Sequence, residues 1–190
     1  LKTAADLNLK KAEQGDPEAQ IDLGYMYERG DGVAKDIGKA IEWYQKAADQ
    51  GDATAQLSVG FAYANGDGVT KDVVKAFEWF QKAADQGNAT AQAMVGYAYA
   101  HGEGVTKDLE KAFEWVQKAA DQGYLEAQFL LGVMYAKGEG VTKDSVKAVE
   151  WFQKAAEQGD AAAQARLGVM YFNGEHVHQE SVEAGERLRN

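Results

Sequence analysis

The chain contains no cysteine, a single proline and no long apolar run. Without cysteine, a disulfide framework, a cysteine-ligated zinc site and a cysteine nucleophile are excluded. No apolar stretch approaches the roughly 20 residues that a membrane-spanning helix needs, so direct membrane insertion is not expected. Basic residues are also few, with 20 Lys and Arg against 30 Asp and Glu and a formal net charge of −10. This acidity argues against nucleic acid and anionic membranes as partners.

The glycines, by contrast, are plentiful and regularly spaced, with a period of 36 residues. The leading position of the period is occupied by Gly15, Gly51, Gly87, Gly123 and Gly159. Glutamine, tyrosine and tryptophan keep the same register: Gln20, Gln56, Gln92, Gln128 and Gln164; Tyr27, Tyr63, Tyr99, Tyr135 and Tyr171; Trp43, Trp79, Trp115 and Trp151. Such a period is diagnostic of a repeat array.

Each period is predicted to form two helices, the first running in the opening unit roughly from Asp16 to Arg29. Asp16 is a suitable N-cap, and Pro17 takes the first helical position, where its missing N–H costs nothing. Gly30 is suited to end this helix in a left-handed conformation.

The second helix is predicted over roughly 37–50, capped by Asp36 and ended by Gly51. The apolar spacing is helical throughout the chain, so no strands are expected. The sequence therefore predicts an all-α protein built from 36-residue helix–turn–helix repeats.

The repeated motif resembles the Sel-1-like repeat family, a relative of the tetratricopeptide repeat with a longer loop between its helices. In the first unit the motif comprises Ala19-Gln20, Leu23-Gly24, Tyr27, Gly30, Gly32-Val33, Asp36, Lys39-Ala40, Glu42-Trp43, Lys46-Ala47-Ala48 and Gln50-Gly51. The resemblance covers about residues 12–184. It implies a right-handed superhelical solenoid whose concave face is lined by the first helices. It also implies an adaptor or scaffolding role, in bacteria often in exported or host-contacting proteins.

We expect a single repeat domain over residues 1–190. Residues 1–14 would form an N-terminal capping helix, followed by repeats 15–50, 51–86, 87–122 and 123–158 and a degenerate capping repeat over 159–190. The last unit carries His176 in place of glycine and Arg187 in place of tryptophan, which suits the end of an array. An alternative is self-association through the terminal repeats.

The fixed positions of the first helix fall on one half of its circumference when residues are placed about 100° apart. In the first unit these are Ala19, Gln20, Leu23, Gly24, Tyr27 and Gly30. This half is predicted to form the core, with Gln20 and its equivalents satisfied by a hydrogen bond to a neighbouring turn.

Several motifs suggest chemistry but are better explained by structure. The tryptophan row could stack bases or sugars, yet a fixed position favours packing between repeats. The loop Gly30-Asp31-Gly32-Val33 lacks the strand and the Gly-Lys-Ser/Thr ending of a phosphate loop, and it is too short for a calcium loop. His176 and His178 form the only histidine pair, and we interpret it as part of a degenerate terminal loop. No metal or cofactor is therefore expected.

A catalytic triad is not supported either, because the three serines lie outside any strained turn motif. We expect no enzymatic activity. Relatives rich in cysteine have been associated with β-lactams, but this chain lacks their cysteines. An enzyme or binding protein for cell-wall or β-lactam ligands, and a module binding envelope glycans, remain the alternatives.

The varying half of the first helices is the predicted binding face. Its candidate residues are Tyr25, Arg29, Phe61, Asn65, Met94, Tyr97, His101, Phe129, Leu130, Val133, Lys137, Arg166, Phe172 and Asn173. An apolar row within a charged rim is typical of a peptide or helix acceptor. The resulting hypothesis is a bacterial scaffold, periplasmic or secreted rather than cytoplasmic, that binds a protein or peptide on its concave face.

Overall fold

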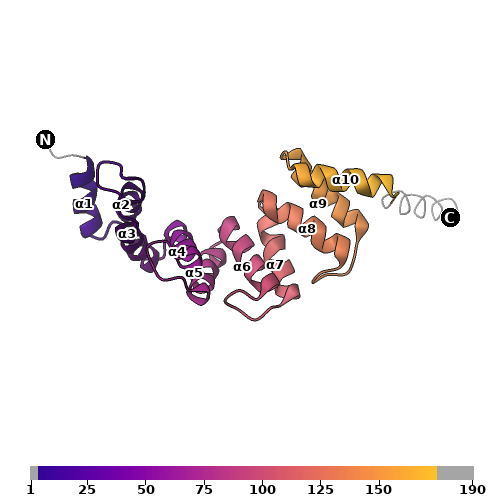
Figure 1. Ribbon diagram of the computed structural model, residues 1–190, viewed down its shortest axis with the longest axis horizontal. Coiled ribbons are helices and arrows are strands. Elements are labelled where there is room, and N and C mark those ends of the chain that lie inside the picture. The colour runs from indigo at the N-terminus through magenta and orange to yellow at the C-terminus, as the bar shows by residue number, and fades with distance from the viewer. Residues whose placement is uncertain (1–3, 175–190) are drawn as a thin grey trace. The chain divides into compact units, whose positions relative to one another are not determined.

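A computed structural model describes residues 4–174 of the chain, and this part contains ten α-helices and no strand (Figure 1). The helices are α1 (Ala4–Glu13), α2 (Pro17–Arg29), α3 (Ile37–Asp49), α4 (Ala53–Asn65), α5 (Val73–Asp85), α6 (Ala89–His101), α7 (Leu109–Asp121), α8 (Leu125–Lys137), α9 (Ser145–Glu157) and α10 (Ala161–Phe172). The predicted all-α repeat architecture is confirmed.

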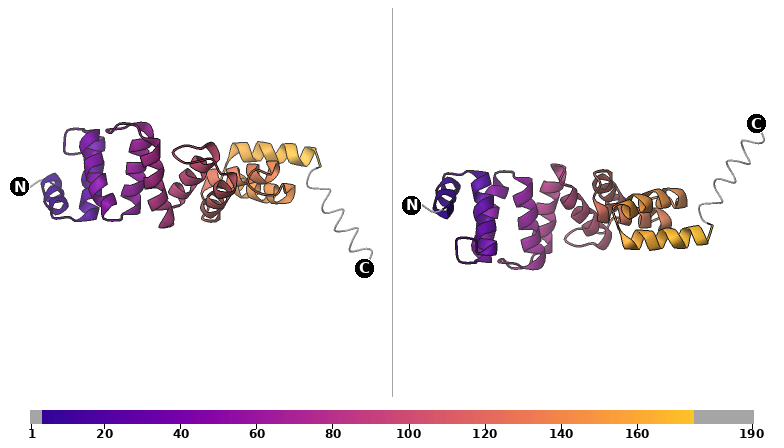
Figure 2. Two further views of the ribbon diagram at one scale, coloured as in Figure 1. Left: turned by 90° about the horizontal axis from the view of Figure 1, so that it is seen from below. Right: turned by 90° about the horizontal axis from the view of Figure 1, so that it is seen from above.

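The chain divides into two compact units, Leu1–Lys107 and Asp108–Asn190. In the first unit, helices α1 to α6 pack in chain order, each against the next, and the side views follow this succession from the indigo α1 onward (Figure 2). In the second unit, α7, α8, α9 and α10 pack on one another in the same successive way.

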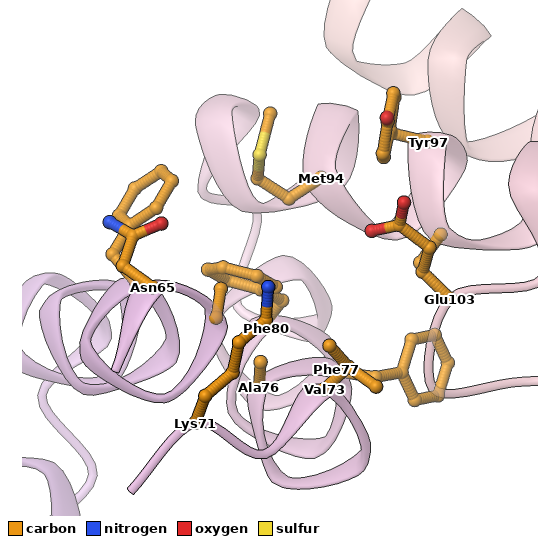
Figure 3. Close-up of a pocket in the computed structure, with 12 residues that line it drawn as sticks. Asn65, Lys71, Val73, Ala76, Phe77, Phe80, Met94, Tyr97 and Glu103 are labelled. Carbon is orange, nitrogen blue, oxygen red and sulfur yellow. The ribbon is translucent and has the colours of Figure 1, made fainter. Parts of the chain in front are cut away.

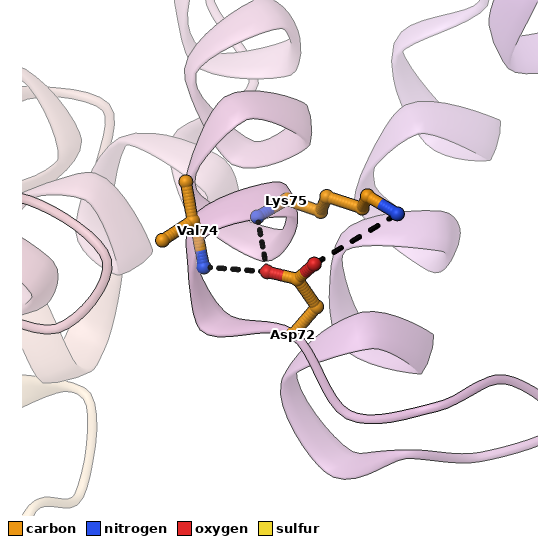
Figure 4. A network of polar contacts seen from close by, with 3 residues as sticks. All are labelled: Asp72, Val74 and Lys75. Carbon is orange, nitrogen blue, oxygen red and sulfur yellow. Dashed lines mark hydrogen bonds and ion pairs between the residues drawn. The ribbon is translucent and has the colours of Figure 1, made fainter.

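Most helix boundaries follow from capping residues that the sequence already suggests, whereas α8 begins after Tyr124 without a side-chain cap. Asp16 accepts a hydrogen bond from the Ala19 amide at 3.1 Å, as an N-cap should. At the start of α5, Asp72 accepts from the amides of Val74 at 3.1 Å and Lys75 at 3.0 Å (Figure 4). Its second carboxylate oxygen lies 3.8 Å from the Lys75 ammonium. This arrangement satisfies backbone donors that have no partner within the helix.

The first helices α2, α4, α6 and α8 each end at a glycine in the left-handed region, where other residues are strained. Gly30 has φ +84° and donates its amide to the Met26 carbonyl at 2.8 Å. Gly66 repeats this ending with φ +85°. The predicted role of these loop glycines is confirmed.

The core lies between the two helices of a repeat and the first helix of the next repeat. One core cluster consists of buried residues from α3 and α4, namely Ala40, Ile41, Tyr44, Ala47, Ala48, Ala55, Val59 and Ala62. Trp79 of α5 packs against this cluster. The first helix reaches the second closely because it carries glycine at the crossing. A Cβ placed on Gly60 would lie 2.6 Å from the Phe80 ring, so glycine makes room for this aromatic.

The repeated glutamines act as buried connectors, as the sequence predicts. Gln56 donates to the Ala48 carbonyl at 3.2 Å and accepts at its own oxygen from Gln86 at 2.8 Å. It therefore joins the end of α3, the start of α4 and the end of α5. Gln20 makes the same two bonds, with the Ala12 carbonyl at 3.0 Å and with Gln50 at 2.8 Å.

The packing interpretation of the tryptophans is confirmed for Trp43 and Trp79. Trp43 and Trp79 are half-buried against core clusters, and Trp151 is buried. The ammonium group of Lys46 lies 3.7 Å from the centre of the Trp43 ring, and Lys82 covers Trp79 at the same distance. The lysines occupy ring faces that a stacking ladder would need.

The predicted histidine pair, His176 and His178, and the changes at Arg187 lie outside the described residues. No group of three or more His, Asp or Glu suited to a metal ion occurs within residues 4–174. In that same part, no helix is long and apolar enough to span a bilayer.

Candidate functional site

Three aromatic side chains occupy equivalent places on the first helices of the first unit and remain partly open to solvent. Tyr25, Phe61 and Tyr97 are 39%, 37% and 44% exposed. Tyr25 packs edge-on against Tyr44 with ring centroids 5.5 Å apart, and Phe61 packs on Phe80 in the same manner at 5.1 Å. The rings of Tyr25 and Phe61 are thus held on one side by the second helix of their own repeat, whereas Tyr97 stacks on His101 of its own helix.

One pocket of about 300 Å³ lies between Tyr25 and Phe61, and we call it the Tyr25–Phe61 pocket. Helices α2 and α4 form its sides and α3 forms its floor. Its lining is Tyr25, Glu28, Ile37, Ala40, Ile41, Tyr44, Ser58, Phe61, Ala62 and Asp67. The two carboxylates stand within an otherwise mostly apolar wall.

A second pocket, of about 320 Å³, lies one repeat further along, between Phe61 and Tyr97. The residues of this Phe61–Tyr97 pocket are Phe61, Ala64, Asn65, Lys71, Val73, Ala76, Phe77, Phe80, Met94, Tyr97, Ala98 and Glu103. Figure 3 shows Lys71 and Glu103 extending toward the pocket from opposite sides. This pocket therefore has an apolar floor and a rim with one charge of each sign.

A shallower space of about 320 Å³ lies before Tyr25, between α1 and α2. Its lining comprises Asn8, Asp22, Tyr25, Met26, Arg29 and Asp31. The three spaces follow one another along the first helices, and Tyr25 and Phe61 are each shared by two of them.

The structure thus brings together several of the predicted binding residues. Phe61, Asn65, Met94 and Tyr97 line the Phe61–Tyr97 pocket, and Tyr25 and Arg29 line the space between α1 and α2. His101 lines none of these three spaces. It stacks on Tyr97 with ring centroids 4.0 Å apart.

The predicted residues of the second unit have more varied surroundings. Phe129 packs against Phe152 with ring centroids 5.6 Å apart, and Leu130 and Val133 are half-buried. The Lys137 ammonium lies 3.5 Å from the Glu139 carboxylate. The remaining three are exposed: Arg166, Phe172 and Asn173.

The repeat geometry agrees with a match to a known family. The family model described as Sel1 repeat matches residues 17–52, 53–88, 89–124, 125–160 and 161–183. The chain belongs to the Sel1 repeat family. Each matched Sel1 repeat begins at the first residue of a first helix, as at Pro17 and Ala53. Proteins of this family are typically non-catalytic scaffolds for protein interaction.

Similar proteins are bacterial. A solved protective antigen with an SLR fold, present in uropathogenic Escherichia coli strains, is 40% identical over 91% of this chain and 37% of its own, with a TM-score of 0.87. A Sel1 repeat protein from Oxalobacter formigenes is also 40% identical, over 83% of this chain and 65% of its own, with a TM-score of 0.79. The secretory immunoglobulin A-binding protein EsiB of Escherichia coli is 42% identical over 38 residues, which are 20% of this chain and 8% of EsiB. This chain therefore spans a minor part of EsiB and of the protective antigen.

Two groups of pocket residues in these Sel1 repeats were not among the sequence-based candidates. The first group comes from the second helices and forms the floors, as Tyr44 and Phe80 do. The second group is acidic and lies in the loop after the first helix, as Asp67 and Glu103 do. The acidic position could have been found from the period, since Asp31, Asp67, Glu103 and Glu139 are spaced 36 residues apart.

One buried tyrosine orients a carboxylate in the wall of the Tyr25–Phe61 pocket. The Tyr44 hydroxyl donates to Glu28 Oε2 at 2.7 Å. Burial and this hydrogen bond raise the pKa of Tyr44 well above its usual value. Tyr44 therefore stays neutral and fixes the carboxylate of Glu28 at the pocket wall.

Proposed function

We propose that this chain is a non-catalytic scaffold whose first-helix face binds a peptide or an extended segment of a partner protein. The observation that carries the proposal is the succession of three spaces divided by the half-exposed rings of Tyr25 and Phe61. A row of separate pockets suits successive side chains of one polypeptide.

The dimensions and composition of the pockets support a polypeptide ligand. Volumes of about 300 and 320 Å³ fall at the lower end of the range of roughly 300–1,000 Å³ that is usual for ligand sites. Exposed aromatic residues and methionine, such as Tyr97 and Met94, are enriched at protein interfaces, and a polar rim around an apolar centre is usual there. These properties favour anchoring of side chains over the chemistry of a small substrate.

The relatives support a protein as the partner. EsiB is named for binding secretory immunoglobulin A, and the solved relative from uropathogenic Escherichia coli is a protective antigen. By analogy we propose a periplasmic or secreted location for this chain. Fractionation of the producing cells, followed by detection of the chain in each fraction, tests the location.

The function is tested by selecting peptides from a random dodecapeptide library on the full chain. The affinity of the selected peptides is then measured on the wild-type chain and on a Phe61→Glu/Tyr97→Glu variant. We expect this variant to lose the peptides, because two charges would be placed on the pocket walls. Far-UV circular dichroism checks that its helix content is retained.

The matched control is a Leu7→Glu/Val74→Glu variant. Both residues are about half exposed, at 51% and 53%, and neither lines one of the three spaces. We expect this control to bind the peptides as the wild type does. Equal binding by the Phe61→Glu/Tyr97→Glu variant would show that the pockets do not hold the ligand.

A further inference from the structure

The Tyr25–Phe61 and Phe61–Tyr97 pockets share their architecture but differ in charge. In the Phe61–Tyr97 pocket, the acidic Glu103 is accompanied by the basic Lys71. The Tyr25–Phe61 pocket is lined by Glu28 and Asp67 and by no basic residue. Two carboxylates within a largely apolar wall create a local negative potential that water screens incompletely.

Each carboxylate has a hydrogen-bond donor of the chain as its partner and no ion-pair partner in the described residues. Glu28 accepts a hydrogen bond from the Tyr44 hydroxyl at 2.7 Å, and Asp67 accepts one from the Asn65 amide at 3.1 Å. Both donors are uncharged, so they orient the carboxylates without removing their charge. Within residues 4–174, no ion pair involves Glu28 or Asp67.

The nearest basic side chain on α2 belongs to the neighbouring space. Arg29 lines the space between α1 and α2, together with Asp22 and Asp31. Its charge there is opposed by two acidic residues. The imbalance in the Tyr25–Phe61 pocket is therefore local to that pocket.

The aromatic lining adds a second feature that suits a cation. Tyr25, Tyr44 and Phe61 all line the Tyr25–Phe61 pocket. Tyr25 and Tyr44 meet at an interplanar angle of 73°, so their rings form a corner. Ring faces attract ammonium and guanidinium groups, and the attraction is greatest where water is displaced. The chain shows the same pairing internally, where Lys46 lies 3.7 Å above the Trp43 ring.

We propose that the Tyr25–Phe61 pocket receives the cationic side chain of a lysine or arginine from the bound peptide. The alkyl part of that side chain would lie against Ile41 and Phe61, and its charged end would lie between Glu28 and Asp67. The adjoining Phe61–Tyr97 pocket, with its balanced rim, would receive an apolar side chain. This inference rests on the proposed peptide-binding function and specifies the chemistry of the ligand.

The test uses synthetic peptides chosen from the same dodecapeptide selection on the full chain. Each is made with its lysine or arginine and again with the neutral replacement, norleucine for lysine or citrulline for arginine. Affinities are measured by fluorescence anisotropy on the wild-type chain and on a Glu28→Gln/Asp67→Asn variant. Glutamine at this position keeps an oxygen that can accept from Tyr44, so the pocket wall is preserved.

We expect the selected peptides to share one basic position. Neutral replacement there should weaken binding to the wild type about tenfold or more, in line with a desolvated cation–aromatic contact supplemented by charge. On the Glu28→Gln/Asp67→Asn variant, the charged and neutral peptides should bind alike. If that double variant does not fold, the single variants Glu28→Gln and Asp67→Asn are compared with the wild type in the same way, and the same convergence of the two peptides is expected.

A Glu42→Gln/Glu78→Gln variant is the matched control, because it removes the same two negative charges at exposed positions on α3 and α5. Equal weakening by the control and the pocket variant would mean that long-range charge alone attracts the peptides, and the proposal would fail. Selected peptides without a shared basic position that still require Phe61 and Tyr97 would overturn the cation pocket and leave peptide binding intact. Failure to select any peptide would overturn both.

Discussion

Alanine at Gly132 and alanine at Gly168 should change stability in opposite directions, although the two glycines occupy equivalent positions of their repeats. Gly132 lies inside α8 and Gly168 inside α10, both in the second unit. A Cβ on Gly132 would lie 2.7 Å from two atoms of the Phe152 ring, and that ring is 1% exposed. Among residues 4–174, no heavy atom would lie within 4 Å of a Cβ on Gly168.

The expected magnitudes follow from two competing effects. Replacing glycine by alanine inside a helix stabilises by about 0.5–1 kcal/mol. Inserting a methyl group into a packed core costs about 1–3 kcal/mol. The free energy of unfolding should therefore rise by about 0.5–1 kcal/mol for Gly168→Ala, because only the first effect operates. It should fall by about 1–2 kcal/mol for Gly132→Ala, since the buried Phe152 ring must shift.

Urea unfolding followed by far-UV circular dichroism measures both changes on the full chain. A double variant, Gly132→Ala/Phe152→Val, provides the mechanistic check, since Val116 occupies the equivalent place in another repeat. Its loss should be smaller than the sum of the two single losses, because valine leaves room for the added methyl group. Stabilisation by Gly132→Ala equal to that by Gly168→Ala would refute the close-packing argument.

Three further outcomes are expected. Gln56→Ala should lower the free energy of unfolding by about 1–3 kcal/mol, because it removes the hydrogen bonds that the Gln56 side chain makes with the Ala48 carbonyl and the Gln86 side chain. Gln164→Ala, at an exposed position, should lower the free energy of unfolding by less in the same urea assay. Hydrogen bonds from backbone amides lower the pKa of the Asp108 carboxyl group below its ordinary value of 3.8. The carboxylate of Asp108 should therefore stabilise the fold above pH 3.8, and this stabilisation should be lost as the pH falls below that value. NMR titration of the carboxyl group and acid unfolding of an Asp108→Asn variant measure the two effects. The raised pKa of Tyr44 means that the folded chain should lose stability as the pH rises above 10, where tyrosine in the unfolded chain ionises. Ultraviolet titration of Tyr44→Phe should show one fewer tyrosine that ionises only at high pH. An unchanged titration curve would contradict the Tyr44–Glu28 hydrogen bond.

Much of the fold is predictable from local rules. The ending of a helix at Gly30, its start after Asp16 and the burial of Gln20 depend on backbone geometry and helical periodicity, and all three features recur in the second and third repeats. The capping aspartate at Asp36 is predicted for the same reason. Comparison of the units within one chain separates positions fixed by packing from those free to vary.

The binding face is less predictable, because a varying position has no rule that assigns its surroundings. Tyr25 and Phe129 both belong to the predicted face, but one ring is 39% exposed and the other is half-buried against Phe152. Lys137 is paired with Glu139, whereas Glu28 bonds a neutral tyrosine. These differences arise from contacts between elements and are absent from the pattern of any single helix.

The sequence by itself determined the period, which comparison along the chain reveals. It also determined the two helices of each repeat, most of their caps and their inward faces, because these depend on residues within a turn or two of one another. The tertiary structure decided what the open face can bind. Tyr44 and Glu28 are 16 residues apart and belong to different helices, and Asp67 comes from a loop in the next repeat. Packing of α2, α3 and α4 places them around one pocket, and this juxtaposition gives that pocket its negative, aromatic character.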